Sequence, residues 1–242
     1  VHIKLETGMH RLGFTDSDIY EMIEAMVNCR TLKIASVFSH LAASYDETLD
    51  KFTHIQAGSF IRLSNLIREK TGSDFTRHLL NSAGTVRFPE YQFDMVRLGI
   101  GLYGISEVDM KGLRTAAGFY TRISQVKTVN KGEGLGYGLK DVSDKKRKIA
   151  ILPLGYADGL RRILGQGRGR VYASGHYLPV TGNVCMDMCM IDISGTELEE
   201  GDEIEIFGEN ISVSEVAGIC NTIPYEILTG IPARVKRIYL YE

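Results

Sequence analysis

The first half of the chain alternates between short apolar runs and longer stretches with apolar residues at helical spacing. Four runs predict β-strands, at residues 1–5, 33–40, 77–81 and 94–99. Strands separated by helices are typical of a parallel sheet, and the carboxyl ends of barrel strands form the functional face. Each predicted strand ends in polar or glycine residues, but four strands cannot close an eight-stranded barrel. The pattern therefore predicts the C-terminal half of a (β/α)8 TIM-type barrel.

Two helices are predicted between these strands. Thr15 is the expected N-cap of the first, because Asp18 follows three residues later as an approximate capping box and apolar residues recur at positions 19, 22, 23 and 26. Gly72 ends the second helix as a C′ glycine. The apolar face expected for that helix consists of Phe52, Ile55, Phe60, Leu63 and Ile67.

The pattern changes near Ala116. Short β-rich runs separated by Gly- and Asp-containing turns follow, with one short helix expected over residues 214–219. These runs are FYTRISQVKTV, RKIAILPLG, GRVYAS, MCMIDIS and EIEIFG. We therefore expect two domains: a partial barrel over residues 1–116 and a mainly β domain over residues 117–242.

Composition narrows the classes of protein to consider. The net charge is -2 and Lys and Arg are not clustered, so no nucleic-acid partner is expected. No apolar stretch of about 18 residues predicts a membrane span, and the first residues do not resemble a signal peptide. No metal site is expected either, because the four cysteines are sparse and no second pair or nearby histidine completes a zinc-binding set. We expect them to be buried thiols in a reducing cytoplasm. These are Cys29, Cys185, Cys189 and Cys220.

Polar clusters at the predicted strand ends are the candidate chemistry. GMHR follows the first strand, His40 ends the second, and Asn81 and Ser82 end the third. Arg97 ends the fourth and is followed by glycines, whose backbone amides could approach an anion. A phosphate cradle with a positioned arginine is one interpretation. Tight turns and solvated strand ends are the other, and composition alone favours the latter.

Eight motifs favour the phosphate cradle instead, because together they resemble the pyridoxal-phosphate (PLP) dependent alanine racemase family. They occur in the family's order, at consistent spacing, and cover nearly the whole chain. The motifs are HIKLETGMHRLGF, FSHLAAS, NSAG, DMVRLGIGLYG, LGYGLK, LPLGYADGLRR, VTGNVCMDM and IPYEILTGIPARVKRIY. The resemblance implies the C-terminal part of the family's barrel followed by its C-terminal β domain.

The resemblance implies that Tyr137 is a catalytic tyrosine, with His40 and Arg97 linking it to the cofactor ring. Racemisation removes a proton from one face of the substrate and delivers one to the other, so two acid/base groups are needed. A tyrosine with a pKa of about 10 needs a positive field and a hydrogen-bond partner to act as a base. Arg97 would face the pyridine nitrogen and, since a guanidinium keeps its proton, leave that nitrogen unprotonated and PLP a weaker electron sink.

Further roles are implied in the same way. Ser82 matches a phosphate ligand, beside the backbone amides of Gly99 and Ile100. Arg11 and the Met186 backbone match groups that hold the substrate carboxylate. Capping of a turn is the alternative for Ser82. Lys4, Tyr156 and Asp187 match positions that line the site. The lysine at the position of Lys4 is carbamylated in some members, and an ordinary strand lysine is the alternative. Tyr156 could equally be a packing residue.

The chain departs from the family pattern in two ways. The family's PLP lysine lies in a motif like VVKANAYGHG, and no such motif occurs here, so we expect this chain alone to be inactive. Val1 opens directly into a predicted strand, so we expect the chain to be a fragment. Second, Ala233 occupies a position where some members carry a phosphate-binding tyrosine. Phosphate binding is then expected to be looser, with room for a larger substrate such as serine.

The resemblance thus implies part of a cytoplasmic enzyme that interconverts L- and D-alanine by a two-base PLP mechanism and supplies D-alanine for peptidoglycan in the cell wall. A homodimer with shared active sites is implied, in which Tyr137 and Met186 reach into the partner's barrel. A serine racemase of the same family, a PLP-carrier protein and a catalytically inactive fragment are the alternatives. PLP carriers lack the β domain. The missing lysine favours a catalytically inactive fragment, whereas retention of Tyr137, His40, Arg97 and Arg11 together argues against it.

Overall fold

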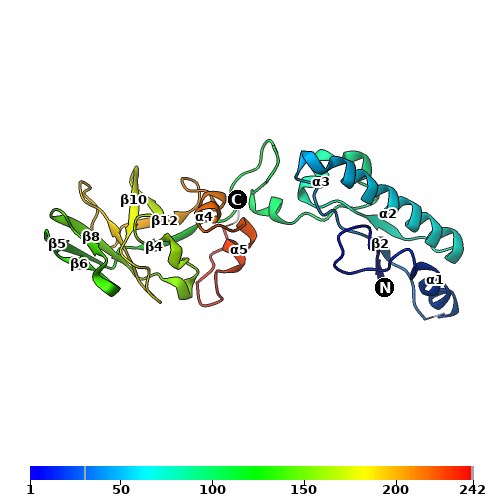
Figure 1. Ribbon diagram of the computed structural model, residues 1–242, viewed down its shortest axis with the longest axis horizontal. Coiled ribbons are helices and arrows are strands. Elements are labelled where there is room, and N and C mark those ends of the chain that lie inside the picture. Colours follow the sequence, from blue (N-terminus) through cyan, green and yellow to red (C-terminus); the bar gives the residue numbers. More distant parts are fainter. Residues whose placement is uncertain (30, 241–242) are drawn as a thin grey trace. The chain divides into compact units, whose positions relative to one another are not determined.

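The computed structural model describes residues 1–29 and 31–240. The chain divides into two compact units, Val1–Arg114 and Thr115–Glu242, of which the first is α/β and the second mainly β (Figure 1). None of the described helices is both long and apolar enough to span a bilayer.

The first unit contains a three-stranded parallel sheet, in the order β1-β2-β3. Its strands are β1 (His2–Lys4), β2 (Ser36–Phe38) and β3 (Thr76–His78). Helices alternate with them along the chain, as expected for part of a barrel. These helices are α1 (Ile19–Asn28), α2 (Asp50–Thr71) and α3 (Ser82–Arg87), with three short 3-10 helices η1 (Glu47–Leu49), η2 (Pro89–Tyr91) and η3 (Ile100–Tyr103).

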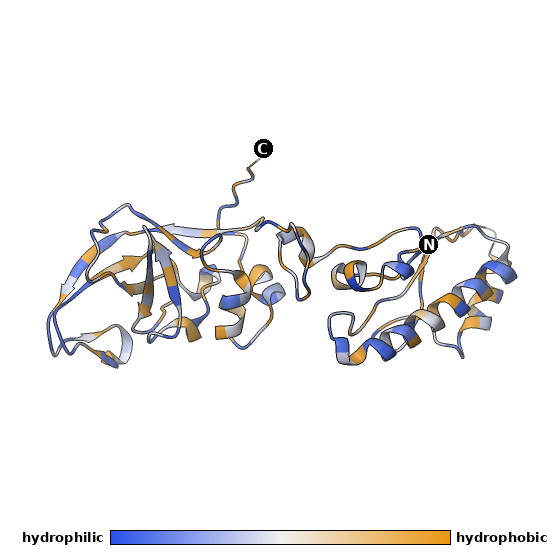
Figure 2. Cartoon of the chain, turned by 90° about the horizontal axis from the view of Figure 1, so that it is seen from above, coloured by the Kyte–Doolittle hydropathy of each residue, from blue (hydrophilic) through white to orange (hydrophobic). Residues whose placement is uncertain are grey.

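The core of this unit lies between the sheet and the helices. Ile3 of β1 and Val37 of β2 are buried in one cluster with residues of α1 and α2. On α2, the large apolar side chains that are fully buried are Phe60, Leu63 and Ile67, each of which contributes about 2 kcal/mol by its removal from water. Apolar and polar residues alternate along this long helix (Figure 2), because only one of its faces packs on the sheet.

Three predictions for this unit need correction. Residues 94–99 do not form a strand, because their contact with β3 is limited to an isolated bridge between Met95 and His78 and a few backbone hydrogen bonds. The first helix begins at Ile19, and the turn at Thr15 precedes it, although the Asp18 carboxylate does accept the Thr15 N–H at 2.9 Å. Ile55 is 56 % exposed, on the outer side of α2. The C′ glycine of α2 is confirmed, since Gly72 has a φ of 63°.

The second unit is built on a seven-stranded antiparallel sheet, in the order β4-β12-β9-β10-β11-β8-β5. Buried residues of its strands, such as Ile149, Val180 and Ile204, form part of its core. The strands are β4 (Phe119–Arg122), β5 (Gln125–Val129), β8 (Arg147–Leu152), β9 (Arg170–Ala173), β10 (His176–Thr181), β11 (Cys189–Asp192) and β12 (Glu203–Phe207).

Smaller elements complete the second unit. A separate hairpin joins β6 (Gly134–Leu135) to β7 (Asp141–Val142). Its two helices are α4 (Val213–Ile219), which confirms the helix expected there, and α5 (Pro224–Thr229), which the sequence pattern did not predict. The short 3-10 helices are η4 (Tyr137–Leu139), η5 (Tyr156–Asp158) and η6 (Arg162–Leu164).

Candidate functional site

The sheet of the first unit presents one face of polar and aromatic side chains. Its register places Ile3 beside Val37 and, one residue further along each strand, Lys4 beside Phe38 beside His78. Successive side chains of a strand point to opposite faces. Because Ile3 and Val37 pack against the helices, the other three lie on the face that the helices do not cover.

Arg97 follows the third strand and turns its guanidinium toward this face. Nη2 donates to the carbonyl oxygens of Ser39 at 2.6 Å and Leu79 at 3.2 Å, and lies 3.3 Å from Nδ1 of His40. Nη1 donates to the carbonyl oxygen of His78 at 3.1 Å and to the Nδ1 atom of the same residue. All of these acceptors are neutral, and no described carboxylate pairs with the guanidinium. Nε donates to no described residue, so one N–H of the cation is free for a ligand.

His40 and His78 are the two imidazoles beside this cation. Burial, followed by the charges of Arg97, Arg11 and Lys4, lowers the pKa of His40 from 6.5 to about 4. Burial and then Arg97 and His2 lower the pKa of His78 from 6.5 to about 4. Burial also lowers the pKa of Arg97. Near neutral pH both imidazoles are therefore uncharged and can accept hydrogen bonds from the guanidinium.

Lys4 and Arg11 extend the positive region. Burial and the nearby charge of Arg11 lower the pKa of Lys4, against the opposing effect of Glu6. Arg11 lies on the exposed loop after β1, and its guanidinium pairs with no described residue. The loop is held from inside by the Glu6 carboxylate, which accepts the backbone N–H of Gly8 at 2.5 Å and of Arg11 at 3.2 Å. Burial opposes ionisation of Glu6, but the loop amides outweigh it and lower its pKa.

Ser82 forms a small cradle with the glycines that follow Arg97. Its hydroxyl accepts the backbone N–H of Gly99 at 2.9 Å and of Gly101 at 3.3 Å. A Cβ at Gly101 would lie 3.3 Å from the Ser82 Oγ, so a larger residue would crowd this turn. The N–H of Ile100 donates to no described residue. The free amide and the remaining O–H donor of Ser82 suit an anion such as a phosphate group.

Tyr137 lies in the second unit, at the start of η4, with 76 % of its surface exposed. Gly136 and Gly138 flank it with φ angles of 61° and 76°, a region that favours glycine. The Asn183 side chain donates to the carbonyl oxygen of Tyr137 at 2.7 Å. This bond connects the tyrosine loop to the segment that carries Met186.

Tyr156 and Met186 lie on neighbouring loops of the same unit. The N–H of Tyr156 donates to the Cys185 carbonyl at 3.0 Å, and that of Ala157 to the Met186 carbonyl at 2.8 Å. A Cβ at Gly155 would lie only 2.4 Å from this backbone, so the close approach requires glycine. The N–H of Met186 donates to no described residue and is available to a ligand.

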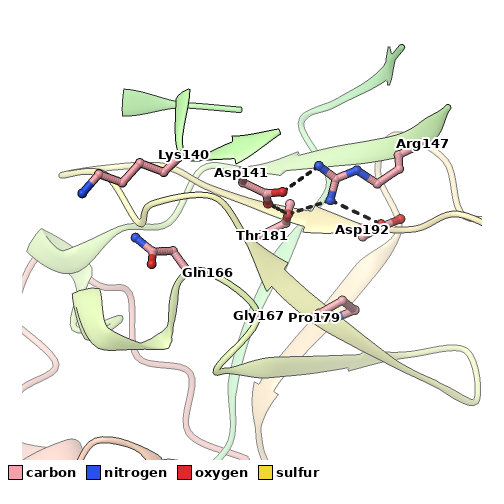
Figure 3. A pocket seen from close by; sticks show the side chains of 8 residues that line it. All are labelled: Lys140, Asp141, Arg147, Gln166, Gly167, Pro179, Thr181 and Asp192. Carbon is pink, nitrogen blue, oxygen red and sulfur yellow. Dashed lines mark hydrogen bonds and ion pairs between the residues drawn. The ribbon is translucent and has the colours of Figure 1, made fainter. Parts of the chain in front are cut away.

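An ion-pair network braces the tyrosine loop against the sheet (Figure 3). Asp141 of β7 accepts hydrogen bonds from Thr181 and from the Gly182 N–H at 2.9 Å, and pairs with Arg147 of β8 at 2.8 Å. Arg147 also lies 3.9 Å from Asp192. Burial opposes ionisation of Asp141, but these partners outweigh it and lower its pKa. The network borders a polar pocket of about 350 Å³, to which Lys140, next to the tyrosine loop, contributes.

The predicted site residues thus form two groups. In the first unit, the charges of Lys4, Arg11 and Arg97 act on His40, while Ser82, Gly99 and Ile100 form the cradle. In the second unit, hydrogen bonds connect the loops of Tyr137, Tyr156 and Met186, and Asp187 is exposed beside Met186.

The motifs did not single out several residues that hold these groups in place. His2, Ser36 and His78 lie on the polar sheet face, Glu6 holds the Arg11 loop, and Asn183 holds the Tyr137 loop. The period-2 alternation of polar and apolar residues in HIK is the signal that could have found the first of them.

No cluster of three metal-ligating side chains occurs among the residues that the structure describes. All four cysteines are free. Burial raises the pKa of the Cys189 thiol to about 12, which makes it unreactive. Hydrogen bonds with Thr31 instead lower the pKa of the Cys29 thiol.

Comparisons with known proteins agree over the whole chain. The sequence profile described as "Alanine racemase, N-terminal domain" matches residues 1–107, and that described as "Alanine racemase, C-terminal domain" matches residues 116–239. Alanine racemase 2 of Caldanaerobacter subterraneus subsp. tengcongensis is 39 % identical and alanine racemase 2 of Bacillus subtilis 36 % identical. Both alignments cover 100 % of this chain and 64 % of the relative, so the chain spans about two-thirds of the relatives' length.

Solved structures give the same result. Alanine racemase from the D-cycloserine producer Streptomyces lavendulae is 32 % identical with a TM-score of 0.92, covering 100 % of this chain and 66 % of that one. Alanine racemase from Bartonella henselae, with covalently bound pyridoxal phosphate, is 29 % identical with a TM-score of 0.85, covering 98 % and 66 %. Over the part that it covers, this chain therefore shares the fold of these racemases, namely part of a barrel followed by a mainly β domain.

Proposed function

The chain belongs to the PLP-dependent alanine racemase family, and we propose that it forms part of an enzyme that interconverts L-alanine and D-alanine. The observation that carries the proposal is the guanidinium of Arg97, which is held by neutral acceptors and keeps its Nε–H free. An uncompensated cation with one free donor suits a heteroaromatic nitrogen that must stay unprotonated.

The residues of the first unit fit pyridoxal 5′-phosphate. Arg97 would donate its Nε–H to the ring nitrogen, and Ser82 with the free amide of Ile100 would hold the phosphate. The Gly99 amide, which donates to the Ser82 hydroxyl, would keep that hydroxyl in place. PLP, when bound, withdraws electrons from the substrate α-carbon and so makes its proton removable. Residues 1–242 contain no match to the family's lysine motif, and we propose that they do not complete the site by themselves.

Tyr137 is the proposed proton carrier of this chain. Its Oη would take the α-proton from one face of the substrate or deliver it there, as one of the two acid/base groups. A phenol can act as a base where a positive charge and a hydrogen-bond donor stabilise its ionised form, and in the proposed shared site these would be Arg97 and a hydrogen bond from His40. His40 can donate this bond from Nε2, because its Nδ1 faces the Arg97 guanidinium at 3.3 Å.

The Arg11 guanidinium and the Met186 amide are the proposed carboxylate-binding groups, since neither donates to a described residue. Lys4 beside Arg11 has a lowered pKa, which favours the neutral amine that reacts with carbon dioxide. Carbamylation of Lys4 would place a negative charge beside Arg11 instead of a positive one. Lys4 is therefore a candidate for orienting Arg11.

We further propose a cytoplasmic homodimer with shared active sites, in which D-alanine serves peptidoglycan synthesis. The support is a group of exposed apolar side chains on the connected loops of the second unit, which includes Tyr137 at 76 %, Leu139 at 62 % and Met186 at 60 % exposure. Large apolar side chains gathered on a surface are typical of protein interfaces. In a dimer these loops would contact the partner's barrel.

A serine racemase of the same family is the second candidate. It is favoured by Ala233, a small exposed residue where some members carry a phosphate-binding tyrosine. The space left by the smaller residue would accommodate a hydroxymethyl side chain.

The test is the formation of D-alanine from L-alanine, and of D-serine from L-serine, by the full-length protein with added PLP. Alanine turnover that exceeds serine turnover supports the proposal, and the reverse preference would establish the second candidate. A protein that binds PLP but racemises neither amino acid would overturn both. Residues 1–242 assayed alone are expected to be inactive, and activity of this stretch would show that one of its own lysines binds the cofactor.

A further inference from the structure

A hydrogen-bonded row of side chains crosses the polar face of the three-stranded sheet and ends at Arg97. Nδ1 of His2 lies 2.7 Å from Oγ of Ser36, and Nε2 of His78 lies 3.0 Å from the same oxygen. The other ring nitrogen of His78, Nδ1, bonds to Nη1 of Arg97. The row joins β1, β2 and β3 to the residue proposed to face the cofactor ring.

The chemistry of the groups fixes the direction of the bonds from Arg97 through His78 to Ser36. A guanidinium can only donate, so Nδ1 of His78 must accept and the proton of the neutral ring must be on Nε2. That N–H then donates to the Ser36 oxygen. The Ser36 hydroxyl can either donate to Nδ1 of His2 or accept a second hydrogen bond from it, because its oxygen has two lone pairs. The bonds of His78 have the same direction in both cases.

Packing holds the central imidazole in one orientation. His78 is 5 % exposed and Ser36 is 3 % exposed. The His78 ring stacks on Phe38, with centroids 5.0 Å apart and planes 9° from parallel. Phe38 also lies under the guanidinium of Arg97, 5.4 Å from the ring centroid. A ring turned over about its own axis would keep the stacking but lose the acceptor toward Arg97.

We propose that His78 is a positioning residue, which aims the Arg97 guanidinium through its Nδ1 lone pair while Ser36 accepts the hydrogen bond of its Nε2–H. The two bonds of Nη1 to His78 and those of Nη2 to the strand-end carbonyls leave Nε as the free donor. The inference rests on the proposed function, because it assigns Nε to the cofactor ring. His78 itself would touch neither cofactor nor substrate.

Two substitutions separate this role from a purely structural one. In His78→Asn the side-chain oxygen can replace Nδ1 as acceptor, but the aromatic stacking is lost. In His78→Phe the stacking on Phe38 is kept, but the acceptor is lost. Positioning predicts that Phe weakens PLP binding by about tenfold to a hundredfold, the range for one charge-assisted hydrogen bond, and that Asn weakens it by less than about threefold. A residue needed only for packing would give the reverse order.

The experiment measures PLP affinity by equilibrium dialysis of the full-length protein and its two variants. Its companion is a nitrogen-15 NMR spectrum of the histidine rings in the unmodified protein, which reports the tautomer directly. We expect His78 as a neutral ring protonated at Nε2. A proton on Nδ1 of His78, or an affinity loss for Asn equal to that for Phe, would overturn the inference. Because the spectrum is recorded on the unmodified protein, it tests the tautomer even where a variant does not fold.

Failure of the inference can be told apart from failure of the proposed function. A protein that racemises alanine but carries the Nδ1 tautomer at His78 would retain its function and refute the positioning role. A protein with the expected His78 tautomer and order of affinities but without racemisation would retain the positioning role and refute the function.

Discussion

Arg97 in the first unit and Arg147 in the second are both largely withdrawn from solvent, but their surroundings differ in charge. The side chain of Arg147 is 12 % exposed and faces the carboxylates of Asp141 and Asp192. Arg97 faces carbonyl oxygens and two neutral imidazoles, and no described carboxylate pairs with it. One arginine is neutralised where it lies, and the other keeps its full charge.

This difference separates a structural cation from a functional one. A buried ion pair satisfies both partners and connects elements, in this case β7, β8 and β10 around the loop of Tyr137. A cation without a counter-ion is unfavourable for folding, and it persists where the surrounding backbone holds it firmly. The free charge of Arg97 is therefore the property that a ligand would use, whereas the charge of Arg147 is already compensated.

The largest effect on catalysis is expected at the loop that the Arg147 network braces. Tyr137→Phe should lower kcat/KM for alanine by about 100-fold or more, the usual contribution of an acid/base group. Both directions should fall together, because the equilibrium constant of a racemisation cannot change. Since Tyr137 is 76 % exposed, unfolding should be unaffected. Unchanged rates in both directions would remove Tyr137 from the mechanism.

A pair of matched substitutions tests the comparison itself. Arg147→Met leaves two carboxylates without their partner and should lower the free energy of unfolding of the second unit by about 3 kcal/mol. Arg97→Met removes hydrogen bonds to buried carbonyls, but it also removes the cost of a cation without a counter-ion. These effects oppose each other, so the free energy of unfolding of the first unit should change by at most about 1 kcal/mol, while PLP affinity falls. Urea-dependent hydrogen exchange reports the two units separately. Equal destabilisation by the two substitutions would contradict the distinction drawn between them.

Features encoded by neighbouring residues could be predicted from the sequence, whereas those set by strand register could not. The C′ role of Gly72 and the short helix near residue 215 depend on local spacing, and the structure confirms both. The prediction of a strand at residues 94–99 was wrong, because these residues form only scattered hydrogen bonds with β3. The strand β10 was not predicted, because Pro179 interrupts its β-rich pattern.

The candidate site shows the same difference between locally encoded features and those set by strand register. The motifs drew attention to Arg97 and Tyr137, because both stand in recognisable glycine-rich contexts. The contact between Ser36 and His78 depends on pairing between strands about 40 residues apart, and no local pattern encodes it. The absence of a described carboxylate beside Arg97 likewise becomes visible only when the strands are assembled.

The smallest effect concerns the neutral imidazoles that accept from Arg97. Both have a pKa lowered from 6.5 to about 4, so between these values the unfolded chain binds more protons than the folded one. The free energy of unfolding of the first unit should therefore be constant above about pH 6.5 and fall as the pH decreases toward 4. The slope is at most about 1.4 kcal/mol per pH unit for each histidine. Solvent screening reduces the share of half-buried His40.

Hydrogen exchange of the α2 amides between pH 7 and pH 4.5 measures this slope in the first unit alone. His40→Asn combined with His78→Asn should flatten it, because asparagine can accept from the guanidinium without titrating. His176→Asn, at an exposed position of the second unit, is the matched control and should leave the slope unchanged. A slope that survives the double substitution would show that carboxylates, rather than the imidazoles around Arg97, dominate the acid sensitivity. The contrast between a compensated and an uncompensated arginine would then have no consequence for stability in this pH range.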